Sequence, residues 1–151
     1  MITNEYFDQL TEQIRLSYAH LLKMHIQYCI KYKHFKNKIC DDEMKIDFQQ
    51  IEQIFFNENN KINWASIRPL MPPKIEGKIK KEFNKLNINE IRLCCLILFN
   101  VHSKNIAEIL PYTQKSVHSM THRIKRKTGI KKIKEGFKKF MLNDIIENTQ
   151  H

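Results

Sequence analysis

The sequence predicts an all-α protein, with an N-terminal helical region followed by a C-terminal four-helix domain. Three observations support this class. Apolar residues recur at helical spacing along most of the chain. The 151 residues include three glycines and four prolines, fewer turn residues than a protein of many short strands needs. The hydrophobic fraction of 42% is normal for a globular protein, and a chain of this length can bury a core without disulfides or metals.

Residues 4–37 are predicted to form one long helix. Large apolar or aromatic residues recur there every seven positions, at Phe7, Ile14, Leu21, Tyr28 and Phe35. Such a repeat is typical of a coiled-coil seam, and an amphipathic helix packed within its own domain shows the same pattern. The sequence leaves both interpretations open, although Ser17 and Lys31 at the intervening seam positions weaken the first.

Further helices are predicted before residue 87. One would begin at Asp41 or Asp42, either of which is a good N-cap, and end before the loop 57–60. Its apolar face would contain Met44, Phe48, Ile51, Ile54 and Phe55. After a short apolar patch, Pro73 suits the first turn of the next helix. The apolar face of that helix would contain Ile75, Ile79, Phe83 and Leu86.

The net charge of +10 is concentrated near the C-terminus. Residues 101–143 contain eleven Lys or Arg and two Glu, so this segment alone carries +9. Localised basicity of this kind is typical of a protein that binds a polyanion. For the basic run at 123–132 alone, the simpler interpretation is a solvated helix end, which the helix dipole favours.

Several function classes find no support in the sequence. The start, MITNEYFDQL, is polar rather than a signal peptide, and the longest apolar run, Leu93 to Phe99, is too short to span a membrane. The four cysteines lack disulfide or zinc spacing, which predicts a cytoplasmic protein without a metal or cofactor. No phosphate-binding glycine loop or nucleophile motif is present, so no catalytic residue is assigned and an enzyme is not expected.

A helix-turn-helix is predicted between residues 104 and 128. This motif needs a small residue on its first helix and apolar residues facing it from the second. Ala107 is the small residue, and Thr113 is a good N-cap for the second helix, 114–128. The motif core would be Ile106, Ala107, Leu110, Val117, Met120 and Ile124. Upstream, Asn87 and Glu90 have the spacing of a capping box at the start of another helix.

Residues 86–129 resemble the LuxR-type (GerE-like) helix-turn-helix of bacterial transcription regulators. The resemblance is carried by LNINEIRLCCLI (86–97), KNIAEIL (104–110) and SVHSMTHRIKRKTG (116–129). It implies a DNA-binding domain at 73–151 that regulates transcription on double-stranded DNA. Residues 1–72 would then be a helical region for dimerisation or signal input. A homodimer would form through the N-terminal helix or the last helix.

In such a domain the second helix of the motif enters the major groove. By resemblance, the base-reading residues are Lys115, His118, Ser119 and His122. The resemblance assigns phosphate contacts to Lys104, Thr113, Arg123, Arg126 and Lys127. Histidine is a poorer base reader than Arg or Asn, whose paired hydrogen-bonding groups match G or A.

The chain departs from the family in ways that keep a second interpretation open. Pro111 stands where the family usually has Gly or Asn, and proline cannot adopt the left-handed conformation that those residues allow. His102 replaces the usual Ser, so Ser103 is expected to cap the first motif helix one residue late. A protein-interaction module that keeps the helix-turn-helix fold without DNA is therefore the alternative. A sigma-factor-like region is a weaker one, since residues 1–80 show no other sigma-factor region.

Overall fold

The computed structural model describes residues 3–38 and 42–141. Every regular element in these ranges is helical, which confirms the all-α class, and their one β pairing is an isolated bridge between Phe56 and Ile62. The elements are α1 (Asn4–Lys36), α2 (Asp42–Phe55), α3 (Trp64–Ile67), the 3₁₀ turn η1 (Arg68–Leu70), α4 (Ile75–Glu82), α5 (Ile88–Leu98), α6 (Ser103–Ile106), α7 (Gln114–Thr128) and α8 (Ile133–Phe137). None of the described helices combines the length and apolar character needed to cross a membrane.

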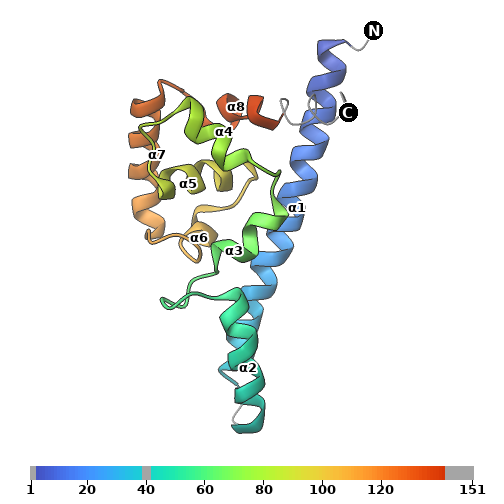
Figure 1. Cartoon of the computed structure of the whole chain (residues 1–151), viewed down its shortest axis with the longest axis vertical. Helices are drawn as coiled ribbons and strands as arrows, with labels where there is room; N and C mark the ends of the chain where they lie inside the picture. Colours follow the sequence, from blue (N-terminus) through green and yellow to red (C-terminus); the bar gives the residue numbers. More distant parts are fainter. Residues whose placement is uncertain (1–2, 39–41, 142–151) are drawn as a thin grey trace.

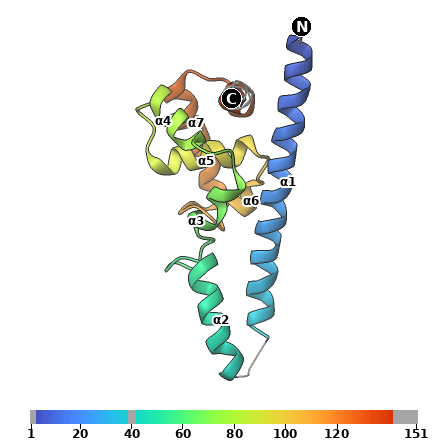
Figure 2. The same cartoon turned by 45° about the vertical axis from the view of Figure 1, so that its right-hand side comes forward.

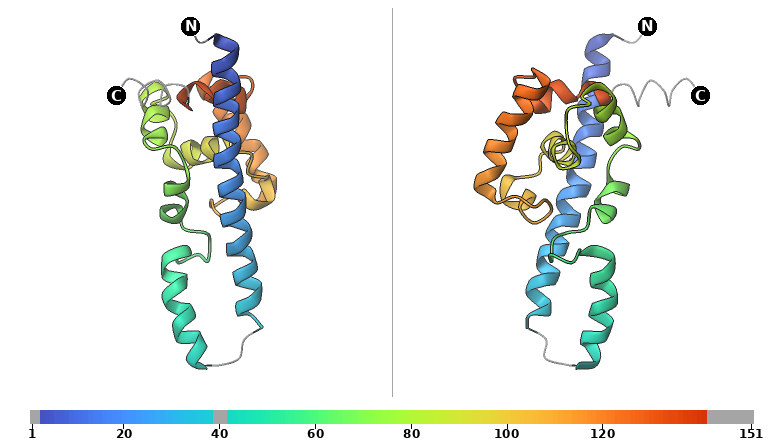
Figure 3. Two further views of the ribbon diagram at one scale, coloured as in Figure 1. Left: turned by 90° about the vertical axis from the view of Figure 1, so that its right-hand side faces the viewer. Right: turned by 60° about the vertical axis from the view of Figure 1, so that its left-hand side comes forward.

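The helices are arranged along α1 in two connected parts (Figure 1). α2 runs antiparallel beside the C-terminal part of α1, so that these two helices form a hairpin (Figures 1 and 2). Helices α4 to α8 gather as a body beside the rest of α1, and α3 lies between this body and the hairpin (Figure 3). α1 is therefore the element that both parts share.

α1 is a single helix, as the sequence predicts, but its buried face is not the sevenfold seam. The buried residues recur every three or four positions: Thr11, Arg15, Ala19, Leu22, Ile26 and Cys29. Of the seam residues, Leu21, Tyr28 and Phe35 are 48%, 63% and 56% exposed. The C-terminal part of the seam is thus left out of the core of its own chain.

α5 is the centre of the core. Seven of its eleven residues are buried, and a helix that is apolar on all sides must be covered on all sides. Helices α4, α7 and α8 contact it. Phe99, just after α5, packs against Tyr18 of α1 with ring centroids 5.7 Å apart. One hydrophobic cluster therefore contains residues from both sides of the predicted domain boundary at residue 72.

The adjacent cysteines of α5 are part of this core. Cys94 and Cys95 are both fully buried. Burial raises the pKa of the Cys94 thiol to about 12 and holds that of Cys95 well above its ordinary value. Neutral, inaccessible thiols are neither good nucleophiles nor good metal ligands, so these residues act as small apolar packing groups.

Two local expectations are wrong. α4 begins at Ile75 and does not include Pro73 in its first turn, because Lys74 takes a left-handed φ of 67° and the chain becomes helical only after it. The predicted apolar face of α2 is not wholly covered: Phe48 and Phe55 are half-buried against aromatic rings of α1, whereas Ile51 is 39% and Ile54 62% exposed. The predicted roles of Asp41 and of the Met44 side chain lie outside the described residues.

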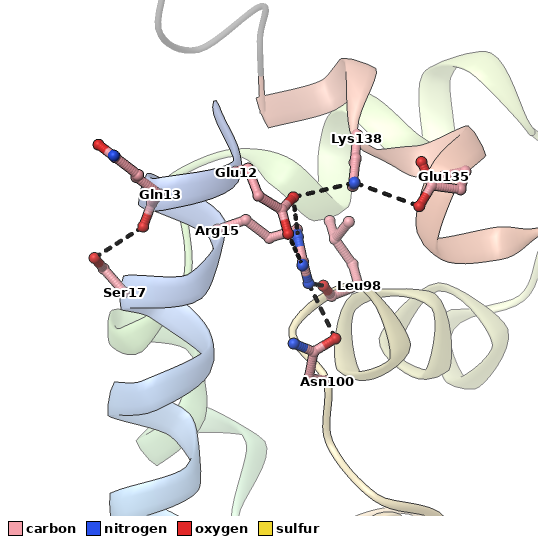
Figure 4. Close-up of polar contacts among 8 residues, drawn as sticks. All are labelled: Glu12, Gln13, Arg15, Ser17, Leu98, Asn100, Glu135 and Lys138. Atoms are coloured by element: carbon pink, nitrogen blue, oxygen red, sulfur yellow. Dashed lines mark hydrogen bonds and ion pairs between the residues drawn. The ribbon is translucent and has the colours of Figure 1, made fainter. Parts of the chain in front are cut away.

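Arg15 of α1 holds the C-terminal end of α5 (Figure 4). Its Nη1 donates to the backbone oxygen of Leu98 at 2.9 Å and to Oδ1 of Asn100 at 3.0 Å. A cation in this place is favoured by the helix dipole and satisfies a carbonyl that lacks a partner within its own helix. The Arg15 side chain is 5% exposed, so these contacts are shielded from water.

Glu12 neutralises this buried cation and extends the contact to the segment after α8. Arg15 Nε donates to Glu12 Oε2 at 3.0 Å, and Arg15 Nη2 also pairs with Glu12 Oε1. Lys138 Nζ lies 3.0 Å from Glu12 Oε2 and 3.4 Å from Glu135 Oε1. The hydrogen bond from Arg15, reinforced by Lys138 and opposed by partial burial, lowers the pKa of Glu12 to about 2.

The lowered pKa of Glu12 makes the free energy of unfolding depend on pH in the acid range. The folded-state pKa lies below the ordinary value of 4.5, so Glu12 contributes its full stabilisation above that value and loses it as the pH falls toward about 2. Glu12→Gln should lower the free energy of unfolding at neutral pH and should flatten its decline in acid. Denaturant unfolding followed by circular dichroism at several pH values measures both effects. Glu58→Gln, in the exposed loop after α2, is the control and should keep the wild-type pH profile.

Candidate nucleic-acid interface

The first helix of the predicted motif, α6, is only one turn long, and hydrogen-bonded turns follow it. The amide of Leu110 donates to the backbone oxygen of Ile106 at 2.9 Å, so helical turns continue to Leu110. The N-cap is His102, whose Nδ1 accepts from the amide of Lys104 at 3.3 Å. The expectation that Ser103 caps this helix is wrong, because the imidazole nitrogen supplies the acceptor that a serine would otherwise supply.

The corner before α7 is built around Pro111 without a left-handed residue. No residue from 107 to 113 has a positive φ. Pro111 is exposed, and Tyr112 is half-buried beside it, where burial raises the pKa of its hydroxyl. Thr113 then caps α7, as predicted, with its Oγ1 accepting from the amide of Ser116 at 3.1 Å. The proline therefore changes how the corner is made without delaying the start of α7.

α7 covers the predicted second helix of the motif, and one of its faces belongs to the core. Val117 and Ile124 are buried and Met120 is half-buried. On the other side of the corner, Ile106 and Leu110 are buried in the same hydrophobic cluster, whereas Ala107 is half-buried. The helix ends at Gly129, which takes a left-handed φ of 74° that favours glycine.

The opposite face of α7 is open to solvent. The four predicted base-reading residues are all exposed: Lys115, His118, Ser119 and His122. Their spacing of three, four and seven positions places them in one stripe along the helix. None of these residues is needed for packing, so the stripe is free to meet a partner.

Two residues of this stripe contact each other. His118 Nε2 and His122 Nε2 lie 3.1 Å apart, with the rings nearly perpendicular. In a neutral pair one nitrogen donates and the other accepts. A ligand that uses these Nε2 atoms must therefore displace this contact, whereas the other ring nitrogen of each residue is outside it.

Exposed basic residues flank the stripe. Arg123 and Arg126 on α7 and Lys104 on α6 are at the surface, and none has an ion-pair partner within the part of the chain that the structure describes. Thr113 is also exposed; its oxygen accepts the capping bond, and its hydroxyl proton can still be donated. The predicted phosphate-contacting residues other than Lys127 are thus accessible.

Lys127 has an intramolecular partner that sequence reasoning missed. Its Nζ lies 2.7 Å from Oε1 of Glu90, a carboxylate with no exposed surface. The same Glu90 oxygen accepts from the amide of Asn87 at 2.9 Å and completes the predicted capping box of α5. Lys127 therefore ties the C-terminal end of α7 to the N-terminal end of α5. The capping-box spacing revealed the role of Glu90, but nothing local indicates a partner 37 residues away.

Two neighbouring cations at the C-terminal end of α7, Lys127 and Arg126, should differ in their contribution to stability. Lys127→Met leaves the buried Glu90 carboxylate without its cation, which should cost about 1–3 kcal/mol. Arg126→Met removes the same charge from an exposed neighbour and should change stability by less than about 0.5 kcal/mol. Urea unfolding of both variants measures the difference. Equal losses would show that the Lys127–Glu90 pair does not hold the helix.

The exposed face of α7 therefore offers hydrogen-bonding groups and positive charge on a firmly anchored helix. The described residues contain no group of three or more His, Cys, Asp or Glu arranged to hold a metal ion. Comparison of the chain with protein-family models, curated proteins and solved structures finds no match. The function is accordingly inferred from the geometry of this face.

Proposed function

We propose that this protein is a sequence-specific regulator of transcription that binds double-stranded DNA with α7 in the major groove. The observation that carries the proposal is the division of α7 into two faces. One face is buried in the core, and the other presents polar and basic side chains of the kinds that contact DNA. A helix anchored in this way can enter a groove without losing any of its own packing.

The stripe at the start of α7 would meet base edges. Lys115 lies in the first turn and can donate to guanine. His118, Ser119 and His122 offer single hydrogen bonds rather than paired ones, so each contributes modest discrimination. We infer that specificity is spread over several weak contacts and over the shape of the DNA.

The basic residues around the stripe would meet phosphates. Arg123, Arg126 and Lys104 are exposed and lack intramolecular ion pairs in the described ranges, so their charges are available to the DNA backbone. Lys127 would have to leave the buried Glu90 carboxylate to do the same, which opposes its predicted phosphate contact. Phosphate contacts fix the position of the helix on the duplex and supply the salt-dependent part of the affinity.

The alternative is a protein-interaction module with the same fold. The contact between His118 and His122 favours it, since two of the proposed base-reading nitrogens already face each other. Salt dependence separates the two functions, because apolar helix contacts are far less sensitive to salt than phosphate contacts are.

DNA binding can be tested with fluorescence anisotropy of a labelled random-sequence duplex titrated with the full chain. With the three available cations Lys104, Arg123 and Arg126, affinity should fall roughly 10- to 10²-fold over a fourfold rise in salt. Arg123→Ala/Arg126→Ala should weaken binding at low salt and reduce the salt slope by about two. Lys38→Ala/Lys81→Ala removes the same charge from exposed sites on other elements and should bind like the wild type. Absence of binding at low salt by the folded protein would refute the proposal.

Base reading is tested after selection of a preferred duplex from a random pool. His118→Ala and His122→Ala should each lower the preference for the selected duplex over random DNA by up to about tenfold, the scale of one hydrogen bond. Binding to random DNA should change little, because both residues lie off the phosphate-contacting positions. An unchanged preference in both variants would exclude these residues from base reading.

A further inference from the structure

The hairpin of α1 and α2 leaves large apolar side chains uncovered. The exposed residues are Leu21 (48%), Met24 (39%), Tyr28 (63%) and Phe35 (56%) on α1, with Ile51 (39%) and Ile54 (62%) on α2. We call these six residues the hairpin face. The α1 members are the C-terminal part of the sevenfold seam and its intervening position at Met24, so a pattern typical of helix association is present and unused within the chain.

The members of the hairpin face share one side of the hairpin. Tyr28 of α1 and Ile51 of α2 line the same hollow of about 260 Å³, together with His25, Tyr32 and Phe55. Leu21 and Met24 precede Tyr28 by seven and four positions, and Ile54 follows Ile51 by three. Residues at these spacings lie above one another on a helix. The face is therefore continuous across both helices.

Another side of the hairpin has the opposite character. There Lys36 pairs with Glu52 of α2, and Lys33 Nζ lies 3.1 Å from Glu108 Oε2. Lys33 and Glu52 line a separate, more polar hollow on that side. Charge is thus gathered away from the hairpin face. Lys31 occupies the seam position between Tyr28 and Phe35 and is charged. Its Nζ lies 5.9 Å from the centre of the Tyr28 ring, so the aliphatic part of its side chain runs along the apolar surface.

We propose that the hairpin face binds a second copy of this chain. With full side-chain areas of roughly 150–250 Å² each, the exposed fractions leave on the order of 600 Å² of apolar surface. Two copies would bury on the order of 1,200 Å² before their rims are counted, which reaches the range of specific interfaces.

The shape of the hairpin face also suits packing against a second copy of the same face. It contains both protruding side chains, Tyr28 and Ile54, and the hollow between the helices that can receive such side chains. In a two-fold pairing, a protruding side chain of one copy would meet the hollow of the other. Gln27 and His34 border the α1 seam, and the one Lys or Arg at a seam position between Leu21 and Phe35 is Lys31.

Dimerisation would place two α7 helices on one assembly. This consequence, unlike the pairing itself, rests on the proposed function. Two recognition helices related by a two-fold axis read two half-sites of opposite orientation. A dimer would also add the modest affinities of two helices whose base contacts are individually weak.

Sedimentation velocity of the full chain at increasing micromolar concentration, without DNA, tests the pairing. The wild type should change from monomer to dimer, and Tyr28→Glu/Ile54→Glu should remain a monomer at every concentration. Both substitutions are at exposed positions, so the circular dichroism spectrum should be unchanged. Leu16→Glu/Ile88→Glu is the matched control, because these residues are 47% and 59% exposed but lie off the face, and it should dimerise like the wild type.

Two outcomes overturn the proposal: a wild type that stays monomeric throughout, or a folded Tyr28→Glu/Ile54→Glu variant that still dimerises. The DNA-binding experiment tests the proposed function independently of the pairing. A monomeric variant that retains salt-dependent binding to random DNA supports the proposed function whichever way the pairing is decided. A dimer that never binds DNA would support the pairing and refute the function.

Discussion

The rest of the structure depends on the burial of most of α5. Leu93, Cys94, Cys95, Leu96 and Leu98 have no exposed surface, whereas Ile88 in the first turn is 59% exposed, so the helix is covered on most sides beyond its first turn. Such a helix is stable only if other elements cover every face of it. α4, α7 and α8 cover it within the C-terminal body, and α1 closes the side near Phe99. The position of α7, and hence of the candidate interface, follows from this requirement.

Burying a helix also buries its polar ends, and at each end of α5 a cation from another helix contacts an acceptor. At the N-terminal end, the Glu90 carboxylate accepts from the backbone amide of the N-cap Asn87 and receives Lys127 from α7. At the C-terminal end, Arg15 from α1 donates to the Leu98 carbonyl. The signs of the two charges match the helix dipole, acidic at the start and basic at the end. Because each contact reaches another helix, the same groups that satisfy α5 also align α7 and α1 on it.

When one face of a helix packs in the core, its opposite face is open to a partner. The open faces of α7 and of the α1–α2 hairpin differ in character. α7 presents polar and basic groups, which suit a hydrated polyanion. The hairpin of α1 and α2 presents aliphatic and aromatic groups, which suit a second apolar surface. Residues of α1 and α7 belong to one hydrophobic cluster, so the core connects the two faces. Pairing and DNA reading would then be linked by geometry, without a moving part.

The sequence by itself determined the features that depend on neighbours within a few positions. These include the helical class, the extent of α1 and α7, the Thr113 cap, the capping box at Asn87, and the inward phase of Val117 and Ile124. Each follows from local hydrogen bonding or from helical periodicity, which the order of residues specifies directly. The DNA-reading role of the exposed stripe was predicted too, and it stays a prediction.

Only the tertiary structure decided the features that join distant residues. Arg15 meets Leu98 across 83 positions and Lys127 meets Glu90 across 37, and no local pattern distinguishes these cations from their neighbours. Which stripe of α1 faces the core was equally undetermined, because the seam and the buried face are both compatible with helical spacing. The shape of the body around α5 decides this, and it leaves the C-terminal part of the sevenfold seam outside the core. A sequence specifies which faces a helix has, and packing decides which of them is covered.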